Sequence, residues 1–243
     1  MESQRELFAN NKITEALCQI SFDSSIDLTK LNGFWEALSE KKIYIEKQDQ
    51  PLLQFTLNAT DTLPTRTTIN GLRLQNEAKD KVIQIFPDNI SIHQVGNYTK
   101  WEDFRSNIYS VLDIFKKYFS AEIIRIDLRT INNYDLGLNE DLKKFFKIHL
   151  EVPTSLTNPY NFNFSIEQSY ESNKSFGVIR VNSINQNDTK KVTFDISYVL
   201  LCNESKISLN DSDSLSKELE NGHSKLNSIF MDAITQETKS LIK

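Results

Sequence analysis

The chain has 243 residues, of which 39% are hydrophobic and 25% charged, and its formal net charge is -5. These values are typical of a soluble globular protein, and they exclude a collagen-like chain, a disulfide-rich mini-protein and a disordered tail. The acidic balance disfavours nucleic acid as a partner, because broad phosphate binding needs clustered Lys and Arg. The length allows one large domain or two small ones.

The sequence predicts a cytoplasmic protein that has no membrane partner. No run approaches the ~18 consecutive apolar residues of a membrane-spanning helix, and the N-terminal segment lacks the apolar stretch of a signal peptide. Cys18 and Cys202 each lie in an apolar, strand-like run. We expect both to be buried thiols in a reducing compartment rather than a disulfide or a nucleophile.

The first half of the chain predicts a strand, a helix, a group of strands and a second helix. Residues 13–22 alternate like a strand, and apolar residues recur at helical spacing over residues 28–41, after a predicted N-cap at Asp27. Thr99 and Glu102 have the spacing of a capping box, with Thr99 as the N-cap of a long helix. Further strands are expected at residues 43–45, 52–57, 69–74, 82–86 and 90–93, the last two as a hairpin.

The second half predicts more strands and a closing helix. Residues 122–132 alternate strictly between two faces, residues 139–145 are typical of a short capped helix, and residues 211–214 predict the start of a long helix. Other strands are expected at residues 145–152, 162–170, 176–184 and 191–202, with a polar turn at 185–188. Strands grouped between helices favour an α+β fold, with a mainly antiparallel sheet backed by helices. It is expected as a single domain or as two similar halves, 1–135 and 136–243.

Three segments resemble an uncharacterised, sporadically distributed family of prokaryotic proteins of about this length. They are an N-terminal I-x-E-A strand, a W-E-x-F helix start leading to an R-I-x-L-R-x-I-N strand, and a C-terminal helix with F-x-x-x-I-T. The residues are Ile13, Glu15, Ala16, Ile20 and Phe22; Tyr98, Trp101, Glu102 and Phe104; Arg125, Ile126, Leu128, Arg129, Ile131 and Asn132; and Asp195, Ile196, His223, Phe230, Ile234 and Thr235. The chain departs from the family pattern at Thr130, where Tyr is usual. The resemblance implies the same architecture and a bacterial origin, and the family's sporadic occurrence is associated with host–phage conflict modules and antiviral defence.

The most informative polar pattern is the row formed by Arg125, Asp127 and Arg129. Side chains two positions apart share one face of a strand, so the two guanidinium groups could hold a carboxylate or a phosphate. Asn132, at the end of the strand, could add hydrogen-bond donors. The alternative is a structural ladder in which these arginines pair with acidic neighbours such as Glu15, a carboxylate within an otherwise apolar strand.

The sequence contains no recognisable motif for a cofactor, a metal or a catalytic nucleophile. Its six glycines are scattered singly, which leaves no glycine-rich phosphate-binding loop. The three histidines, His93, His149 and His223, lack the spacing of a zinc site. We therefore predict neither a metal nor a cofactor, and we assign no catalytic residue.

These observations favour a non-catalytic binding or regulatory component that recognises another protein or forms a homo-oligomer, because exposed sheet edges suit dimerisation and strand addition. One alternative is an anion-, nucleotide- or nucleic-acid-binding module that uses Arg125 and Arg129. A second alternative is a hydrolase such as a nuclease, with carboxylates assembled from Glu15, Asp127 and Asp195.

Overall fold

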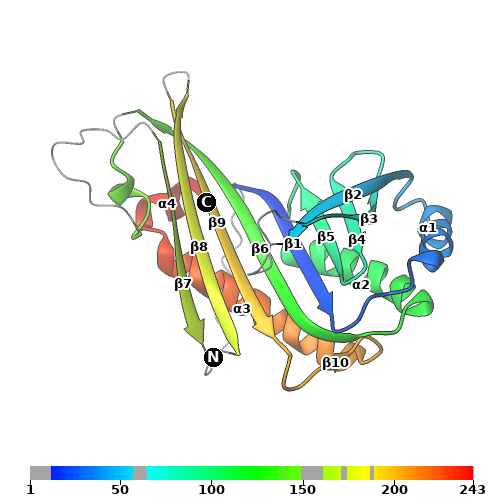
Figure 1. Ribbon diagram of the computed structural model, residues 1–243. Helices are drawn as coiled ribbons and strands as arrows, with labels where there is room; N and C mark the ends of the chain where they lie inside the picture. The colour runs from blue at the N-terminus through cyan, green and yellow to red at the C-terminus, as the bar shows by residue number, and fades with distance from the viewer. Residues whose placement is uncertain are drawn as a thin grey trace. The chain divides into compact units, whose positions relative to one another are not determined.

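The computed structural model in Figure 1 describes residues 12–56, 65–138, 140–148, 161–170, 174–186 and 189–242. Side chains are described within these ranges except at residues 50–56, 65–70 and 186. In this part of the chain the structure contains four α-helices, two short 3-10 helices and ten β-strands.

The strands form one antiparallel sheet, in the order β2-β3-β4-β5-β1-β6-β9-β8-β7, with β10 paired to β6. They are β1 (Ile13–Phe22), β2 (Glu46–Thr56), β3 (Thr65–Gln75), β4 (Lys81–Phe86), β5 (Asn89–Val95), β6 (Glu122–Gly137), β7 (Asn161–Tyr170), β8 (Ser175–Gln186), β9 (Thr189–Leu201) and β10 (Ile207–Ser208). The helices are η1 (Leu28–Lys30), α1 (Leu31–Glu40), α2 (Trp101–Tyr118), η2 (Leu142–Lys144), α3 (Ser212–Ala233) and α4 (Gln236–Ile242). The predicted fold class, α+β with a mainly antiparallel sheet backed by helices, is confirmed.

The chain divides into two compact units. Unit 1 comprises residues 1–16, 128–200 and 218–243, and unit 2 comprises residues 17–127 and 201–217. Strands β1 and β6 and helix α3 each contribute residues to both units. Each unit combines segments from both ends of the chain, while the expected division into two halves near residue 135 stays a prediction.

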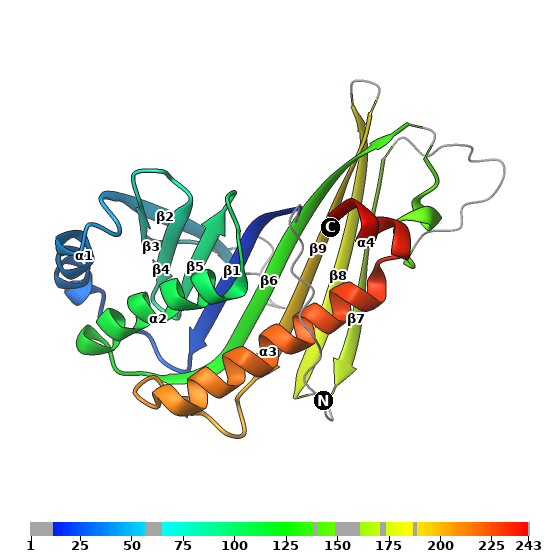
Figure 2. The ribbon, with the colours of Figure 1, turned by 180° about the vertical axis from the view of Figure 1, so that it is seen from behind.

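In unit 2, aromatic side chains from β1, α1 and α2 meet in the core. Phe34 of α1 packs edge to face on Phe115 of α2, with ring centroids 5.4 Å apart, and Phe22 of β1 stacks on Phe115 at 5.7 Å. Figure 2 shows α2 lying across strands β4 and β5. These strands form the predicted hairpin, in which Phe86 pairs with Asn89 around a two-residue turn. Each aromatic pair contributes about 1 kcal/mol beyond its buried area, so the apolar stripe of α2 holds this helix on the sheet.

In unit 1, α3 approaches the sheet closely at two glycines. A Cβ atom at Gly222 of α3 would lie 2.9 Å from Leu128 Cδ1 of β6, and a Cβ atom at Gly177 of β8 would lie 2.7 Å from Ile229 Cδ1 of α3. Figure 2 shows α3 crossing the face formed by β6, β9 and β8. The absence of a side chain at both positions therefore lets the helix pack tightly against these strands.

The predicted capping box at the start of α2 is wrong. The helix begins at Trp101, and Lys100 occupies the N-cap position without a side-chain hydrogen bond. The Thr99 hydroxyl instead donates to Asp103 Oδ2 at 2.6 Å. The hydroxyl proton of Thr99 is thus bound by a carboxylate in the first turn of the helix.

Several predicted boundaries shift by a few residues. The helix expected over residues 28–41 is divided into η1 and α1, and Asp27 caps η1 by accepting a hydrogen bond from the Thr29 N–H at 3.1 Å. No strand covers residues 43–45, because β2 begins at Glu46. In the other direction, β6 continues to Gly137, five residues beyond the predicted end at 132.

The C-terminal helix is interrupted because a neighbouring segment binds its backbone. The Phe145 carbonyl accepts hydrogen bonds from the Thr235 N–H at 3.0 Å and from Thr238 Oγ1 at 2.6 Å, and the Lys147 N–H donates to the Ala233 carbonyl at 2.8 Å. Helix α3 therefore ends and α4 begins around these bonds. Residues 145–148 form a turn and an isolated bridge rather than the predicted strand, whose remaining residues, 149–152, lie outside the described residues.

We expect Gly71→Ala to destabilise unit 2. A Cβ atom at Gly71 would lie 2.7 Å from the Ile85 carbonyl oxygen and 2.5 Å from Phe86 Cε1. Because that carbonyl belongs to the backbone of β4, which pairs with β3, it cannot move without disturbing the ladder. The free energy of unfolding, measured by urea denaturation, should fall by about 1–3 kcal/mol.

The matched control is Gly137→Ala, since a Cβ atom there would meet the flexible Glu140 side chain at 3.3 Å. It should change the free energy of unfolding by less than about 1 kcal/mol. Equal losses for the two variants would contradict the steric argument.

A second prediction concerns Asp211, which precedes α3. Hydrogen bonds from the side chain and the backbone N–H of Ser214 hold the pKa of Asp211 below its usual value of 3.8. A carboxyl whose pKa is lower in the folded state stabilises the fold above pH 3.8, and this contribution disappears as the pH falls through the folded pKa. Asp211→Ala should therefore lower the melting temperature at pH 7, and the difference from wild type should shrink below pH 3.8, as followed by circular dichroism. A difference independent of pH would show that the carboxylate charge is not involved.

Candidate functional site

The predicted candidate Arg129 forms a two-pronged ion pair inside unit 1. From β6, its Nε donates to Asp195 Oδ1 of β9 at 2.8 Å, and its Nη2 donates to Asp195 Oδ2 at 2.6 Å. The Asp195 side chain is 8% exposed and that of Arg129 is 37% exposed. Two parallel N–H···O bonds to one carboxylate are the strongest geometry available to an arginine, so this pair links β6 to β9.

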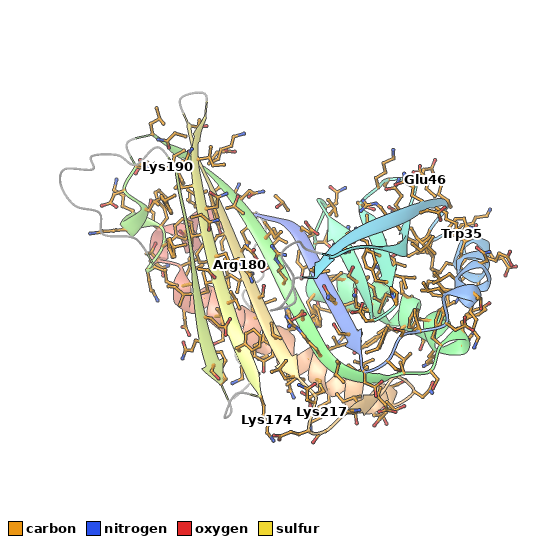
Figure 3. All side chains as sticks on the ribbon, in the orientation of Figure 1. Trp35, Glu46, Lys174, Arg180, Lys190 and Lys217 are labelled. Atoms are coloured by element: carbon orange, nitrogen blue, oxygen red, sulfur yellow. The ribbon has the colours of Figure 1, made fainter. Side chains whose placement is uncertain are left out.

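The ion pair is part of a longer row of alternating charges, which we call the charge row: Glu15, Arg129, Asp195 and Arg180. Arg180 of β8 lies directly opposite Asp195 in the strand register, with Nη1 3.6 Å from Oδ2. At the other end of the row is Glu15 of β1. Hydrogen bonds to Asp195 are the main cause of the raised pKa of Arg129, and the negative charge of Glu15 raises this pKa further. Figure 3 shows Arg180 on β8. The row thus joins four strands with two positive and two negative groups.

The other predicted arginine is paired within unit 2. Arg125 Nε donates to Asp127 on the same strand, at 3.1 Å to Oδ1 and 2.9 Å to Oδ2. Burial, with a smaller contribution from the charge of Asp127, raises the pKa of the Cys18 thiol, which is fully buried. Cys18 and Cys202 are both buried, as predicted, and neither forms a disulfide within the described residues.

Asn132 does not join the charge row. Its Nδ2 donates to the Phe194 carbonyl at 3.2 Å, and the residue is buried. Because side chains alternate between faces, an even position of β6 points away from the face that carries Arg129. The neighbouring Asn133 instead links three strands, since it donates to Thr14 Oγ1 at 3.0 Å and accepts from Thr193 Oγ1 at 2.9 Å.

The charge balance of this site bears on the chemistry it can perform. Each guanidinium group considered for anion binding already faces a carboxylate, Asp127 for Arg125 and Asp195 for Arg129. A phosphate would have to displace that carboxylate and leave it buried without its partner, which is costly. Within the described residues, no three His, Cys, Asp or Glu side chains are close enough to hold a metal ion together; His149 lies outside these residues.

A second candidate site is the outer edge of β7, which no polar motif marks. Strand β7 is the last strand of the described sheet and pairs only its inner edge, with β8, from Asn161 opposite Ile184 to Tyr170 opposite Ser175. None of its ten residues is buried, and Ile166 is 44% exposed. The edge therefore presents a row of backbone N–H and C=O groups together with accessible side chains.

The two faces of β7 differ in character. All odd positions are polar, whereas the even positions carry every apolar residue and one polar residue, Gln168. The rings of Phe162 and Phe164 on the even face stack with centroids 6.0 Å apart. The apolar side shares its face with α3, because a Cβ atom at Gly177 would meet both Tyr170 and Ile229. The helix thus covers one end of the apolar row.

No protein-family model, curated protein or solved structure matches the chain. Within the described residues, no helix combines the length and the apolar character needed to cross a membrane.

If the charge row is structural, removing Arg129 should destabilise the protein. Arg129→Met leaves the Asp195 carboxylate, 8% exposed, without its two-pronged partner. We expect the free energy of unfolding to fall by about 2–3 kcal/mol, measured by urea denaturation. Arg125→Met is the control, since Arg125 is 44% exposed and makes a pair within one strand; its cost should stay below about 1 kcal/mol. A stable Arg129→Met variant that has lost binding of inorganic phosphate would instead support an anion site.

Proposed function

We propose that this protein is a binding component that recognises another protein by accepting one of its strands at the outer edge of β7. The observation that carries this proposal is an exposed, nearly uncharged edge strand at the end of the described sheet. In strand addition, main-chain hydrogen bonds supply affinity and alternate side chains supply specificity. The apolar row on one face of β7 provides such side chains.

A comparison with β2, at the opposite end of the strand order, supports the choice of edge. Strand β2 contains Glu46, Lys47, Asp49 and Pro51. Charged residues and proline are the usual means of preventing edge-to-edge pairing, since proline lacks an N–H and charges are costly to bury. Strand β7 has no proline, and Glu167 is its only charged residue. Within the described sheet, the sequence thus protects the β2 edge with charges and a proline and gives the β7 edge only one charge.

The charge row supports the same proposal from the inside of unit 1. It links β1, β6, β9 and β8. Strand β8, to which β7 is paired, is therefore held in one register. A rigid edge binds an incoming strand without first losing its own conformational freedom. Following the family resemblance, the setting we propose is the bacterial cytoplasm and a host–phage conflict module.

The test compares two isoleucines of equal exposure. Ile166 lies on β7 and is 44% exposed, whereas Ile184 lies on β8 and is 45% exposed. Ile166→Lys introduces a charge at the proposed interface, and Ile184→Lys introduces the same charge on the opposite face of the neighbouring strand. Tagged wild type and both variants are purified from cells of the source organism, and the bound proteins are quantified by mass spectrometry.

A protein that binds wild type and Ile184→Lys but is lost with Ile166→Lys is then purified and titrated by calorimetry. We expect a stoichiometric complex whose dissociation constant rises at least ~10-fold with Ile166→Lys, the equivalent of about 1.4 kcal/mol. A partner that binds Ile166→Lys as tightly as wild type would place recognition elsewhere on the molecule and overturn the proposal.

A further inference from the structure

The sequence of β7 is compatible with antiparallel pairing to itself. Its polar and apolar residues alternate from Asn161 to Ile166, and the apolar row resumes at Tyr170 after the polar Gln168. In an edge strand, the N–H and C=O groups that point outward belong to residues of one parity, so two identical antiparallel edges pair odd positions with odd and even with even. Self-pairing of β7 therefore joins apolar face to apolar face and polar face to polar face.

Glu167, the only charged residue of β7, limits the registers in which two β7 strands can pair. A two-fold axis at Glu167 would place two carboxylates directly opposite each other, which is destabilising. An axis at Ser165 places Glu167 opposite Asn163 and Phe164 opposite Ile166, and it pairs nearly the full length of the strand. Aromatic and β-branched residues are among the favourable cross-strand pairs, and the symmetry produces the Phe164–Ile166 pair twice.

We propose that a second copy of this chain occupies the β7 edge, with two β7 strands paired antiparallel around a two-fold axis at Ser165. This inference rests on the proposed binding role of the β7 edge and names its first occupant. The sheets of the two copies become continuous across the pair, and the exposed side chain of Ile166 is covered. Because the dimer uses the same backbone groups as an incoming strand, a different protein partner binds only by displacing the second copy.

The first experiment measures the oligomeric state and tests whether charges introduced at Ser165 dissociate the dimer. Sedimentation velocity on the full chain, from roughly 1 to 100 μM, should show a concentration-dependent dimer. An interface made by one pair of edge strands is small, and small interfaces bind weakly, so we expect a dissociation constant in the micromolar range. Ser165→Lys places two like charges opposite each other at the axis, beside Arg180, which lies opposite Ser165 on β8, and should raise the dimer dissociation constant at least ~10-fold. Ser165→Glu should raise it less, because Arg180 offsets part of the added negative charge. An equal mixture of the two variants should recover the dimer, because it pairs opposite charges.

Ser169→Lys is the matched control. Ser169 is an exposed serine on the same face of β7, but in the proposed register it lies opposite Asn161 rather than opposite itself. Its substitution should change dimerisation far less than that of Ser165.

The second experiment reads the register directly by cross-linking. The α-carbons of a residue that lies opposite itself in an antiparallel pair are about 4.5–5.5 Å apart, within the range of a disulfide. Ser165→Cys should therefore form a disulfide-linked dimer under mild oxidation. Ser169→Cys should not, since the two cysteines would be about 27 Å apart, eight residues at about 3.4 Å each. The native cysteines, Cys18 and Cys202, are buried and do not compete.

The outcomes separate this inference from the proposed function. A wild-type chain that stays monomeric at ~100 μM overturns the dimer, while a protein partner lost with Ile166→Lys would leave the β7 binding role intact. A dimer that is insensitive to both Ser165 charges, or that cross-links through Ser169→Cys, overturns the proposed β7 register. A dimer with the expected register that binds no other protein upholds the inference and overturns the wider recognition role.

Discussion

The buried carboxylate of Asp195 is the constraint on which the arrangement of unit 1 depends. A carboxylate that is 8% exposed must have positive partners close by, and these come from two other strands, Arg129 of β6 and Arg180 of β8. A slip of one residue would turn Asp195 to the opposite face, among the apolar side chains beneath α3. A slip of two residues would preserve the apolar alternation but separate the charges. The charge row therefore selects one register among those that hydrophobic patterning alone allows.

The other face of these strands is governed by close packing rather than by charge. Gly222 and Gly177 allow α3 to approach the sheet, and Ile229 and Tyr170 fill the space beside Gly177. A single helix is about 10 Å wide and strands are about 4.8 Å apart, so one helix covers only a few neighbouring strands at any point along its length. Ile166, on the same face of the edge strand, is left 44% exposed. The partial exposure of the β7 apolar row is thus a consequence of where the helix packs.

The sequence was sufficient to predict the elements whose patterns are local. The alternation of residues 13–22 matches β1 to the residue. The apolar residues from Trp101 to Phe119 recur at helical spacing and predict α2, which ends one residue earlier, at Tyr118. Thr99 is not the N-cap because α2 begins at Trp101, which leaves Lys100 in that position. The break between α3 and α4 depends on hydrogen bonds from Thr235 to Phe145, 90 residues earlier in the chain, and no local pattern marks it.

The candidate site shows the same limit. The row containing Arg125 and Arg129 could be recognised from alternation, but the choice of Asp195 as the partner of Arg129 joins residues 66 positions apart. Asn132 is close to the arginines in sequence, but an even position on β6 faces away from Arg129. Its side-chain amide donates instead to the Phe194 carbonyl.

The position of β7 at the end of the sheet is also non-local, because it depends on the pairing order of all the strands. One signal was nevertheless present in the sequence. Strand β7 carries Glu167 as its only charge, whereas β2 carries three charged residues and a proline. Charge and proline content, compared between predicted strands, distinguishes a protected edge from an open one.

These constraints together determine which groups remain available to a partner. The arginines and carboxylates that first suggested a binding site bind one another within each unit, and their interactions are used to maintain strand register. The backbone of β7 differs from these side chains, because no strand of the described sheet pairs with its outer edge. Recognition through backbone groups requires only a strand of matching alternation. The charges of this fold therefore maintain strand register, and the nearly neutral β7 edge of the described sheet is the basis on which we propose a protein-binding role.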